Sequence, residues 1–131
     1  MEMKLELVPV PVDDVDHALS FYTEQLGFAL DVDVTPSPGM RVVQLTPPGS
    51  ACSIVIGTGM GPISAMVPGT LKALHLVVAD LAAARAELVG RGVDVGEITD
   101  VGGGVRYAFF ADPDDNTWAL QEMAWRTGDA F

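Results

Sequence analysis

Few side chains of this sequence combine the type and the spacing that catalysis or metal binding requires. The chain has two histidines, His17 and His75, and one cysteine, Cys52. His75 lies in a predicted strand, where an imidazole can act as a general base or form a hydrogen bond with a ligand. Because no partner accompanies it at triad or metal-site spacing, we expect a structural histidine or a ligand contact rather than a catalytic base. His17 follows three aspartates within residues 13–16, which is typical of a solvated helix surface.

The composition indicates one compact domain spanning residues 1–131. Hydrophobic residues make up 49% of the chain, enough to form the core of a single small domain. The formal net charge of −11 repels phosphate backbones, so we expect no nucleic-acid partner. No apolar run approaches the roughly 20 residues of a bilayer span, and the N-terminus lacks signal-peptide features. We therefore expect no membrane association and a cytoplasmic location, which fits a single cysteine that cannot form an intrachain disulfide.

The same β-α-β-β-β pattern occurs twice along the chain. Its clearest part is a hairpin at residues 107–122, where a five-residue polar turn separates two strands. A weaker copy of this hairpin occupies residues 41–56. In each half a strand precedes an amphipathic helix whose expected N-cap is Asp14 or Asp80, and equivalent positions lie 65 or 66 residues apart.

The expected boundaries follow from this duplication. We place module 1 at about residues 4–57, a linker rich in glycine and proline at 58–70, module 2 at about 71–123 and a C-terminal tail at 124–131. The expected strands are residues 5–12, 28–34, 41–45 and 51–56 in module 1, and 71–78, 93–98, 107–111 and 117–122 in module 2.

Two motifs carry a family resemblance over essentially the whole chain. The segments VPVDDVDHALSFYTEQLGF, at the first strand and helix, and FFADPDDNTWALQE, at the last hairpin, resemble the glyoxalase/bleomycin resistance/dioxygenase superfamily with its vicinal oxygen chelate fold. Asp115 stands where this motif more often has glycine. The resemblance implies an α+β fold in which the two modules curl their mixed sheets into an open cup with the helices outside, often completed in a homodimer.

Active members of this superfamily are similar in holding a divalent metal with side chains from the first and last strands of each module. The resemblance places the corresponding positions here at Leu7, Ile54, Ala73 and Ala119. A metal needs three or four donor side chains at such positions, and none of these four residues has a donor atom. We therefore expect no metal and no other cofactor.

Side-chain alternation along the strands places apolar residues on the inner face of the expected cup. These residues either line a pocket for a hydrophobic small molecule or fill the cup as core, and the small side chains of Ala73 and Ala119 favour a pocket. Trp125 in the tail is suited to cover the pocket, to stack on a planar ligand or to contact a partner subunit. The expected ligand contacts are Leu7, Pro9, Ile54, Ile56, Ala73, His75, Val77, Ala119, Gln121 and Trp125.

The resulting functional prediction is a metal-independent binding protein of the bleomycin-resistance type, a homodimer that sequesters a hydrophobic or aromatic antibiotic or metabolite. No catalytic residue is assigned. The alternative is an enzyme, either a glyoxalase-like lyase or isomerase or a ring-cleaving dioxygenase, with no metal or with a displaced metal near His75, Gln121 and Glu122. A third hypothesis is a structural or regulatory dimer whose cup is filled.

Overall fold

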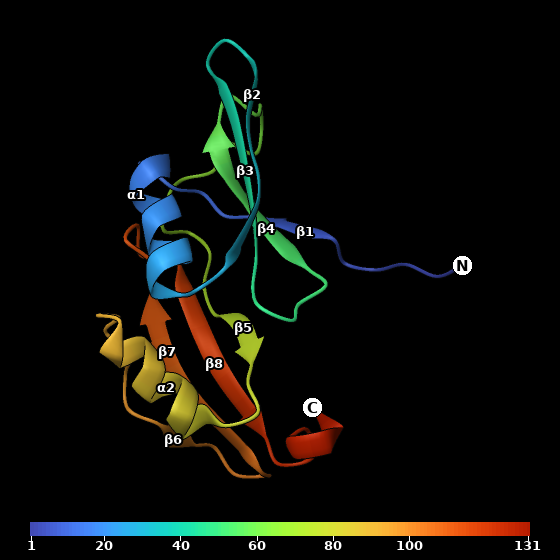
Figure 1. Ribbon diagram of the computed structural model, residues 1–131, viewed down its shortest axis with the longest axis vertical. Coiled ribbons are helices and arrows are strands. Elements are labelled where there is room, and N and C mark those ends of the chain that lie inside the picture. Colours follow the sequence, from blue (N-terminus) through green and yellow to red (C-terminus); the bar gives the residue numbers. More distant parts are fainter. The chain divides into compact units, whose positions relative to one another are not determined.

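The computed structural model describes residues 1–131 and contains two modules of the same design (Figure 1). Module 1 consists of β1 (Leu7–Pro9), α1 (Val15–Ser20), a π-helical turn (Phe21–Gln25), β2 (Ala29–Ser37), β3 (Met40–Thr46) and β4 (Ser53–Thr58). Module 2 consists of β5 (Leu74–Val77), α2 (Leu81–Gly90), β6 (Thr99–Asp100), β7 (Val105–Ala111) and β8 (Thr117–Met123), followed by a short 3-10 helix (Gly128–Ala130). The predicted α+β fold with tandem β-α-β-β-β modules is confirmed.

The chain forms two compact units, each with its own four-stranded sheet. Unit 1 contains residues 1–71 and 113–116, and unit 2 contains residues 72–112 and 117–131. Sheet 1 has the strand order β1-β4-β3-β2, and sheet 2 has the equivalent order β5-β8-β7-β6. In both sheets the first strand pairs in parallel with the last strand of its module, and the other pairs are antiparallel. Neither helix is long and apolar enough to cross a membrane.

Both helices begin at the predicted aspartate caps. The Oδ1 atom of Asp14 accepts from the backbone N–H of His17 at 3.0 Å, and Asp80 does the same for Ala83 at 3.0 Å. After Ser20 the first helix widens into the π-helical turn, so the expected single helix has two parts. This segment ends at Gly27, whose φ of +76° lies in the left-handed region that glycine adopts without strain.

The prediction of a strand at residues 93–98 is wrong. The strand that pairs with this edge of β7 is the two-residue β6, which begins at Thr99. The alternation in this segment reflects burial in a loop, where Val95 is 4% exposed. Two backbone carbonyls of this loop accept hydrogen bonds from a side chain rather than from a neighbouring strand. Arg85 donates through Nε to the Gly96 carbonyl at 2.7 Å and through Nη2 to the Val95 carbonyl at 3.0 Å. Only one bond, from Gly96 N–H to the Phe109 carbonyl at 2.8 Å, links the loop to the sheet.

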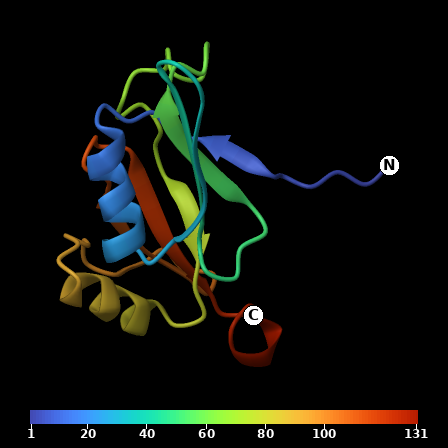
Figure 2. The ribbon, with the colours of Figure 1, turned by 45° about the horizontal axis from the view of Figure 1, so that its top comes forward.

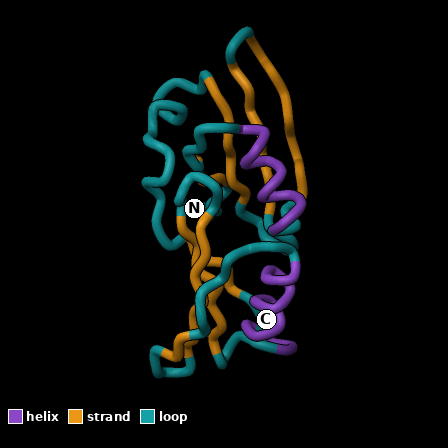
Figure 3. Tube along the Cα trace, turned by 90° about the vertical axis from the view of Figure 1, so that its left-hand side faces the viewer, coloured by secondary structure: helices purple, strands orange, loops and turns teal.

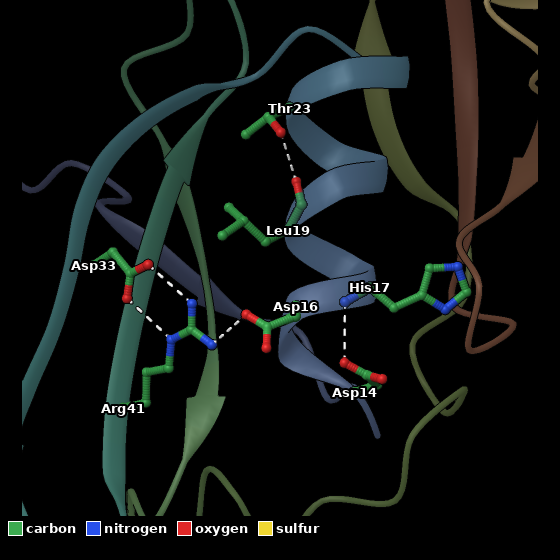
Figure 4. A network of polar contacts seen from close by, with 7 residues as sticks. All are labelled: Asp14, Asp16, His17, Leu19, Thr23, Asp33 and Arg41. Atoms are coloured by element: carbon green, nitrogen blue, oxygen red, sulfur yellow. Dashed lines mark hydrogen bonds and ion pairs between the residues drawn. The ribbon is translucent and has the colours of Figure 1, made fainter.

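In unit 1 an arginine connects the sheet to its helix (Figure 4). Arg41 on β3 donates through Nη1 to Asp16 of α1 at 2.7 Å, and through Nε and Nη2 to Asp33 of β2 at 3.0 and 2.9 Å. The bonds from the guanidinium hold the pKa of Asp33 below its usual value. Because Arg41 lies on the same side of β3 as Val43 and Leu45, which are fully buried, these residues mark the face of sheet 1 that α1 covers.

Unit 2 uses the equivalent arginine with a different acid. Arg106, 65 residues after Arg41, donates through Nε and Nη2 to Oε2 of Glu122 at 3.0 and 2.7 Å. The other carboxylate oxygen of Glu122 accepts from the backbone N–H of Leu81, the first residue of α2, at 3.0 Å. The Leu81 bond, followed by those from Arg106, lowers the pKa of Glu122. These contacts identify the face of sheet 2 that carries Glu122 as the face toward α2 (gold in Figure 1).

The turn between β7 and β8 is anchored in unit 1 by a buried amide. Asn116 is fully buried; its Oδ1 accepts from the N–H groups of Gly69 and Leu71 at 3.1 and 3.3 Å, and its Nδ2 donates to the Pro11 carbonyl at 2.7 Å. The amide thereby fixes the residues after β1 and the end of the long connection between β4 and β5, drawn as a loop in Figure 3. The residues before β1, by contrast, extend away from the strands of unit 1 (Figure 2). Asp115, at the position where related motifs have glycine, has a φ of +68°.

Replacing Asn116 with alanine is expected to lower the free energy of unfolding by about 2–4 kcal/mol, because three backbone groups lose their buried partner. Urea denaturation followed by circular dichroism measures this change. Glu24→Ala, at an exposed position of the same unit, serves as the control and should stay within about 0.5 kcal/mol of wild type. An unchanged urea midpoint for Asn116→Ala contradicts the anchoring role.

Replacing Glu122 with glutamine is expected to lower stability at pH 7 by about 1–2 kcal/mol, since two charge-assisted bonds from Arg106 weaken. The stabilisation from ionised Glu122 is present above the ordinary glutamate pKa of about 4.3 and is lost as pH falls through its lowered folded-state pKa. The difference between wild type and variant should therefore shrink below about pH 4. Melting temperatures measured from pH 7 to pH 3 test this, and a difference that is constant with pH contradicts it.

Candidate ligand-binding site

The face of sheet 2 opposite α2 displays two rows of side chains across three strands. The first row is His75 on β5, Ala119 on β8 and Phe109 on β7, and the second row is Val77, Gln121 and Tyr107 on the same strands. Side chains alternate along a strand, so the neighbours Trp118, Leu120 and Glu122 lie on the helix face instead. We call the six residues of the two rows the open face of sheet 2. Phe109 is 49% exposed and His75 is also exposed, so solvent reaches this face.

Three aromatic rings of the open face contact one another. The His75 and Tyr107 rings meet edge to face with centroids 5.5 Å apart, and Tyr107 stacks on Phe109 at 5.8 Å with an interplanar angle of 22°. Ala119 lies between His75 and Phe109 in the register, and its methyl group is fully buried. A larger side chain at this central position would occupy the space across which the rings meet.

The polar atoms of the open face are held in defined positions. Nδ1 of His75 lies 2.6 Å from the carbonyl oxygen of Ala73, and Nε2 of Gln121 donates to the Tyr107 hydroxyl at 2.9 Å. An aromatic surface with a few oriented polar groups can stack on a planar ligand and fix its orientation.

Ala73 has a different role from the one its sequence position suggested. It precedes β5 rather than belonging to it, and its φ of +57° is a left-handed conformation that costs a non-glycine residue roughly 1–2 kcal/mol. Its N–H donates to Oγ1 of Thr117 at 2.8 Å, and its carbonyl is the group that contacts His75. The residue therefore acts on the open face through its backbone.

The expectation that Ile54 and Ile56 share a face with Leu7 and Pro9 is wrong. Leu7 and Pro9 pair with Ser53 and Val55, so they share the face opposite to that of Ile54 and Ile56. The two isoleucines pair with Leu45 and Val43, and all four residues lie in the core under α1.

The cause is a difference of one residue between the two hairpin turns. Residues 47–52 separate β3 from β4, whereas residues 112–116 separate β7 from β8, so the first turn has six residues and the second has five. A shift of one residue moves every side chain of a strand to the other face. Val55, and not Ile54, is therefore the counterpart of Ala119, and it too has no metal-binding atom.

Three other predicted ligand contacts, Leu7, Pro9 and Trp125, lie outside the open face of sheet 2. Leu7 and Pro9 on β1 are half-buried, whereas Val55 beside them is 3% exposed. Trp125 follows β8 in a turn and is 62% exposed. Its ring lies against Gly104, because a Cβ built on that glycine would be 3.7 Å from the ring.

Two members of the open face, Tyr107 and Phe109, were missing from the residues chosen by sequence. The signal for them was present in the hairpin. A five-residue turn at 112–116 pairs residue 111 with residue 117, and counting back along both strands places Phe109 opposite Ala119 and Tyr107 opposite Gln121.

The displaced metal site considered for His75, Gln121 and Glu122 does not form. Glu122 lies on the helix face, where Arg106 and the Leu81 N–H occupy its two carboxylate oxygens, while His75 and Gln121 lie on the open face. No group of three or more His, Cys, Asp or Glu side chains in the chain is arranged to hold a metal ion.

Comparisons with known proteins agree with the duplicated fold. A family model described as the Glyoxalase/Bleomycin resistance protein/Dioxygenase superfamily matches residues 4–120. The chain is similar to the crystal structure of TnmS3, an antibiotic binding protein from Streptomyces sp. CB03234, with 34% identity and a TM-score of 0.79 over 93% of this chain and 97% of that one. A search of curated proteins finds no match.

Two further crystal structures are similar along nearly their whole length. A glyoxalase/bleomycin resistance protein from Streptomyces sp. CB03234 has 37% identity and a TM-score of 0.74, covering 89% of this chain and 98% of that one. A superfamily member from Sphaerobacter thermophilus DSM 20745 has 30% identity and a TM-score of 0.80, covering 92% and 98%. Together with the modules and motifs described above, these matches show that this chain belongs to the Glyoxalase/Bleomycin resistance protein/Dioxygenase superfamily.

Proposed function

We propose that this protein binds and sequesters a planar aromatic small molecule, an antibiotic or a metabolite, on the open face of sheet 2. The observation that carries the proposal is the contact of His75, Tyr107 and Phe109 above the small residue Ala119. Stacked and edge-to-face rings with a solvent-exposed member offer a flat apolar surface to a second π-system. Val77 and Gln121 complete this surface, and Trp125 of the same unit is a further candidate contact.

Binding without catalysis is favoured by the chemistry of the side chains. Leu7, Val55 and Ala119, on strands where superfamily enzymes hold their metal, carry only hydrocarbon, so the proposed role requires neither a metal nor another cofactor. The description of TnmS3 as an antibiotic binding protein supports a binding role for a chain with 34% identity to it. The single cysteine fits a protein that acts in the cytoplasm.

The proposal predicts that a panel of planar aromatic compounds contains members that raise the melting temperature and quench tryptophan fluorescence. A compound at 100 times its Kd should stabilise the folded protein by about 2.7 kcal/mol. The Phe109→Ala variant should bind about tenfold more weakly, because a stacking contact of about 1.4 kcal/mol is lost. Fluorescence titration of both proteins with the same compound measures this ratio.

Phe131→Ala is the matched control for this experiment. Phe131 belongs to the same unit and is 53% exposed, close to the 49% of Phe109, but lies in the C-terminal tail. Its replacement should leave the affinity within a factor of two of wild type. A broad panel with no stabilising compound, or equal losses in the two variants, refutes the proposed site.

We further propose that the protein forms a homodimer, as the family resemblance implies. Sheet 1 ends in the nine-residue edge strand β2, on which Leu30 and Val34 are each 48% exposed. Exposed apolar side chains on an edge strand favour association with another chain. Sedimentation velocity at micromolar concentration should give twice the monomer mass, and a monomer at all concentrations would exclude this assembly.

A further inference from the structure

The open face of sheet 2 has a defined arrangement of hydrogen-bond donors and acceptors. His75 shows this most directly, because its Nδ1 lies 2.6 Å from the carbonyl oxygen of Ala73. A carbonyl oxygen can only accept, so the proton of this bond belongs to Nδ1. In the neutral imidazole the other nitrogen, Nε2, then carries a lone pair and can only accept.

The backbone before β5 maintains this tautomer. Ala73 adopts the left-handed conformation at φ +57°, and its N–H is bonded to Oγ1 of Thr117 on β8 at 2.8 Å. A residue keeps such a sparsely populated conformation only where the surrounding structure offsets the strain. These residues cluster at ligand-binding and active sites. Here the strained residue, Ala73, is the one whose carbonyl oxygen accepts the hydrogen bond from Nδ1 of His75.

The neighbouring amide adds a second acceptor. Nε2 of Gln121 donates to the Tyr107 hydroxyl at 2.9 Å, which leaves Oε1 of Gln121 as an acceptor and leaves the tyrosine hydrogen for another partner. His75 and Gln121 occupy adjacent rows of the same face, and both contact Tyr107, His75 through its ring and Gln121 through the tyrosine hydroxyl. The open face therefore offers a ligand two acceptors, Nε2 of His75 and Oε1 of Gln121, and one donor, the Tyr107 hydroxyl.

We infer that this face selects aromatic ligands that carry a hydrogen-bond-donating group, a phenolic hydroxyl, and that His75 is the specificity-determining residue that accepts this hydrogen at Nε2. The inference rests on the proposed binding function and adds the chemical class of the ligand. An ether or an unsubstituted ring at the same position leaves Nε2 without a partner in the bound state, which costs affinity.

Paired ligands test this selection. We expect wild type to bind 2-naphthol about tenfold more tightly than 2-methoxynaphthalene, since the two compounds share their ring system and differ in the donor hydrogen. In the His75→Phe variant, which keeps a ring beside Tyr107, this preference should fall to less than about twofold, mainly through weaker binding of the naphthol. His17→Phe, the same change at the other histidine, should keep the wild-type preference.

The outcomes separate the two proposals. Equal binding of both naphthalenes to wild type, or a preference that persists in His75→Phe, overturns the inference while the binding function stands. Binding of neither compound counts against the proposed function itself, and the inference fails with it.

A measurement without ligand tests the tautomer directly. Long-range ¹H–¹⁵N spectra at about pH 9, where an ordinary imidazole is neutral, distinguish the two neutral tautomers. The chain has only two histidines, so the spectrum of His17→Phe assigns the remaining signals to His75. Signals of the Nδ1-protonated form support the inference, and signals of the Nε2-protonated form overturn it.

Discussion

The pleat of β8 is the constraint on which the rest of unit 2 depends. Trp118, Leu120 and Glu122 point toward α2, so Ala119 and Gln121 must point the other way. The helix face is fixed by burial and by the bonds of Glu122 to Arg106 and to the first N–H of α2. Because a slip of one residue would expose Trp118 and bury Gln121, the energy that packs the helix also determines which side chains lie on the open face.

The two modules share one topology but differ in their ion pairs and in the burial of their sheets. Each has an arginine at the equivalent position on its third strand that pairs with acids on the helix side, but Arg41 uses acids of α1 and β2 whereas Arg106 uses one of β8. In module 1 the last strand is buried on both faces, as Ile54 and Val55 are 4% and 3% exposed. In module 2 one face of the sheet keeps exposed aromatic and polar groups. The copies thus keep the same topology, while a candidate ligand-binding surface remains open on module 2.

The candidate site illustrates why counting along a sequence succeeds in one module and fails in the other. In module 2 the alternation placed His75, Val77, Ala119 and Gln121 on one face, as the register of β5 and β8 has it. In module 1 the same count failed at Ile54, because the expected turn at residues 46–50 has five residues, as in module 2, whereas the turn in the structure, residues 47–52, has six. Tyr107 and Phe109 were not identified, because their role depends on rings from different strands meeting over a small residue.

The sequence alone determined the duplicated α+β fold and the helix caps at Asp14 and Asp80, because these follow from local periodicity and capping. The family resemblance indicated which strands hold a metal in superfamily enzymes, and the residue types there are hydrocarbon. Only the tertiary structure decided the short β6, the left-handed Ala73, the pairing of Glu122 with Arg106 and the buried amide of Asn116. Each of these depends on groups far apart in the chain, such as Asn116 and Pro11, which are 105 residues apart. A sequence indicates which side chains can form such bonds. Which partner each one bonds depends on the fold, because the backbone must bring donor and acceptor within hydrogen-bond distance.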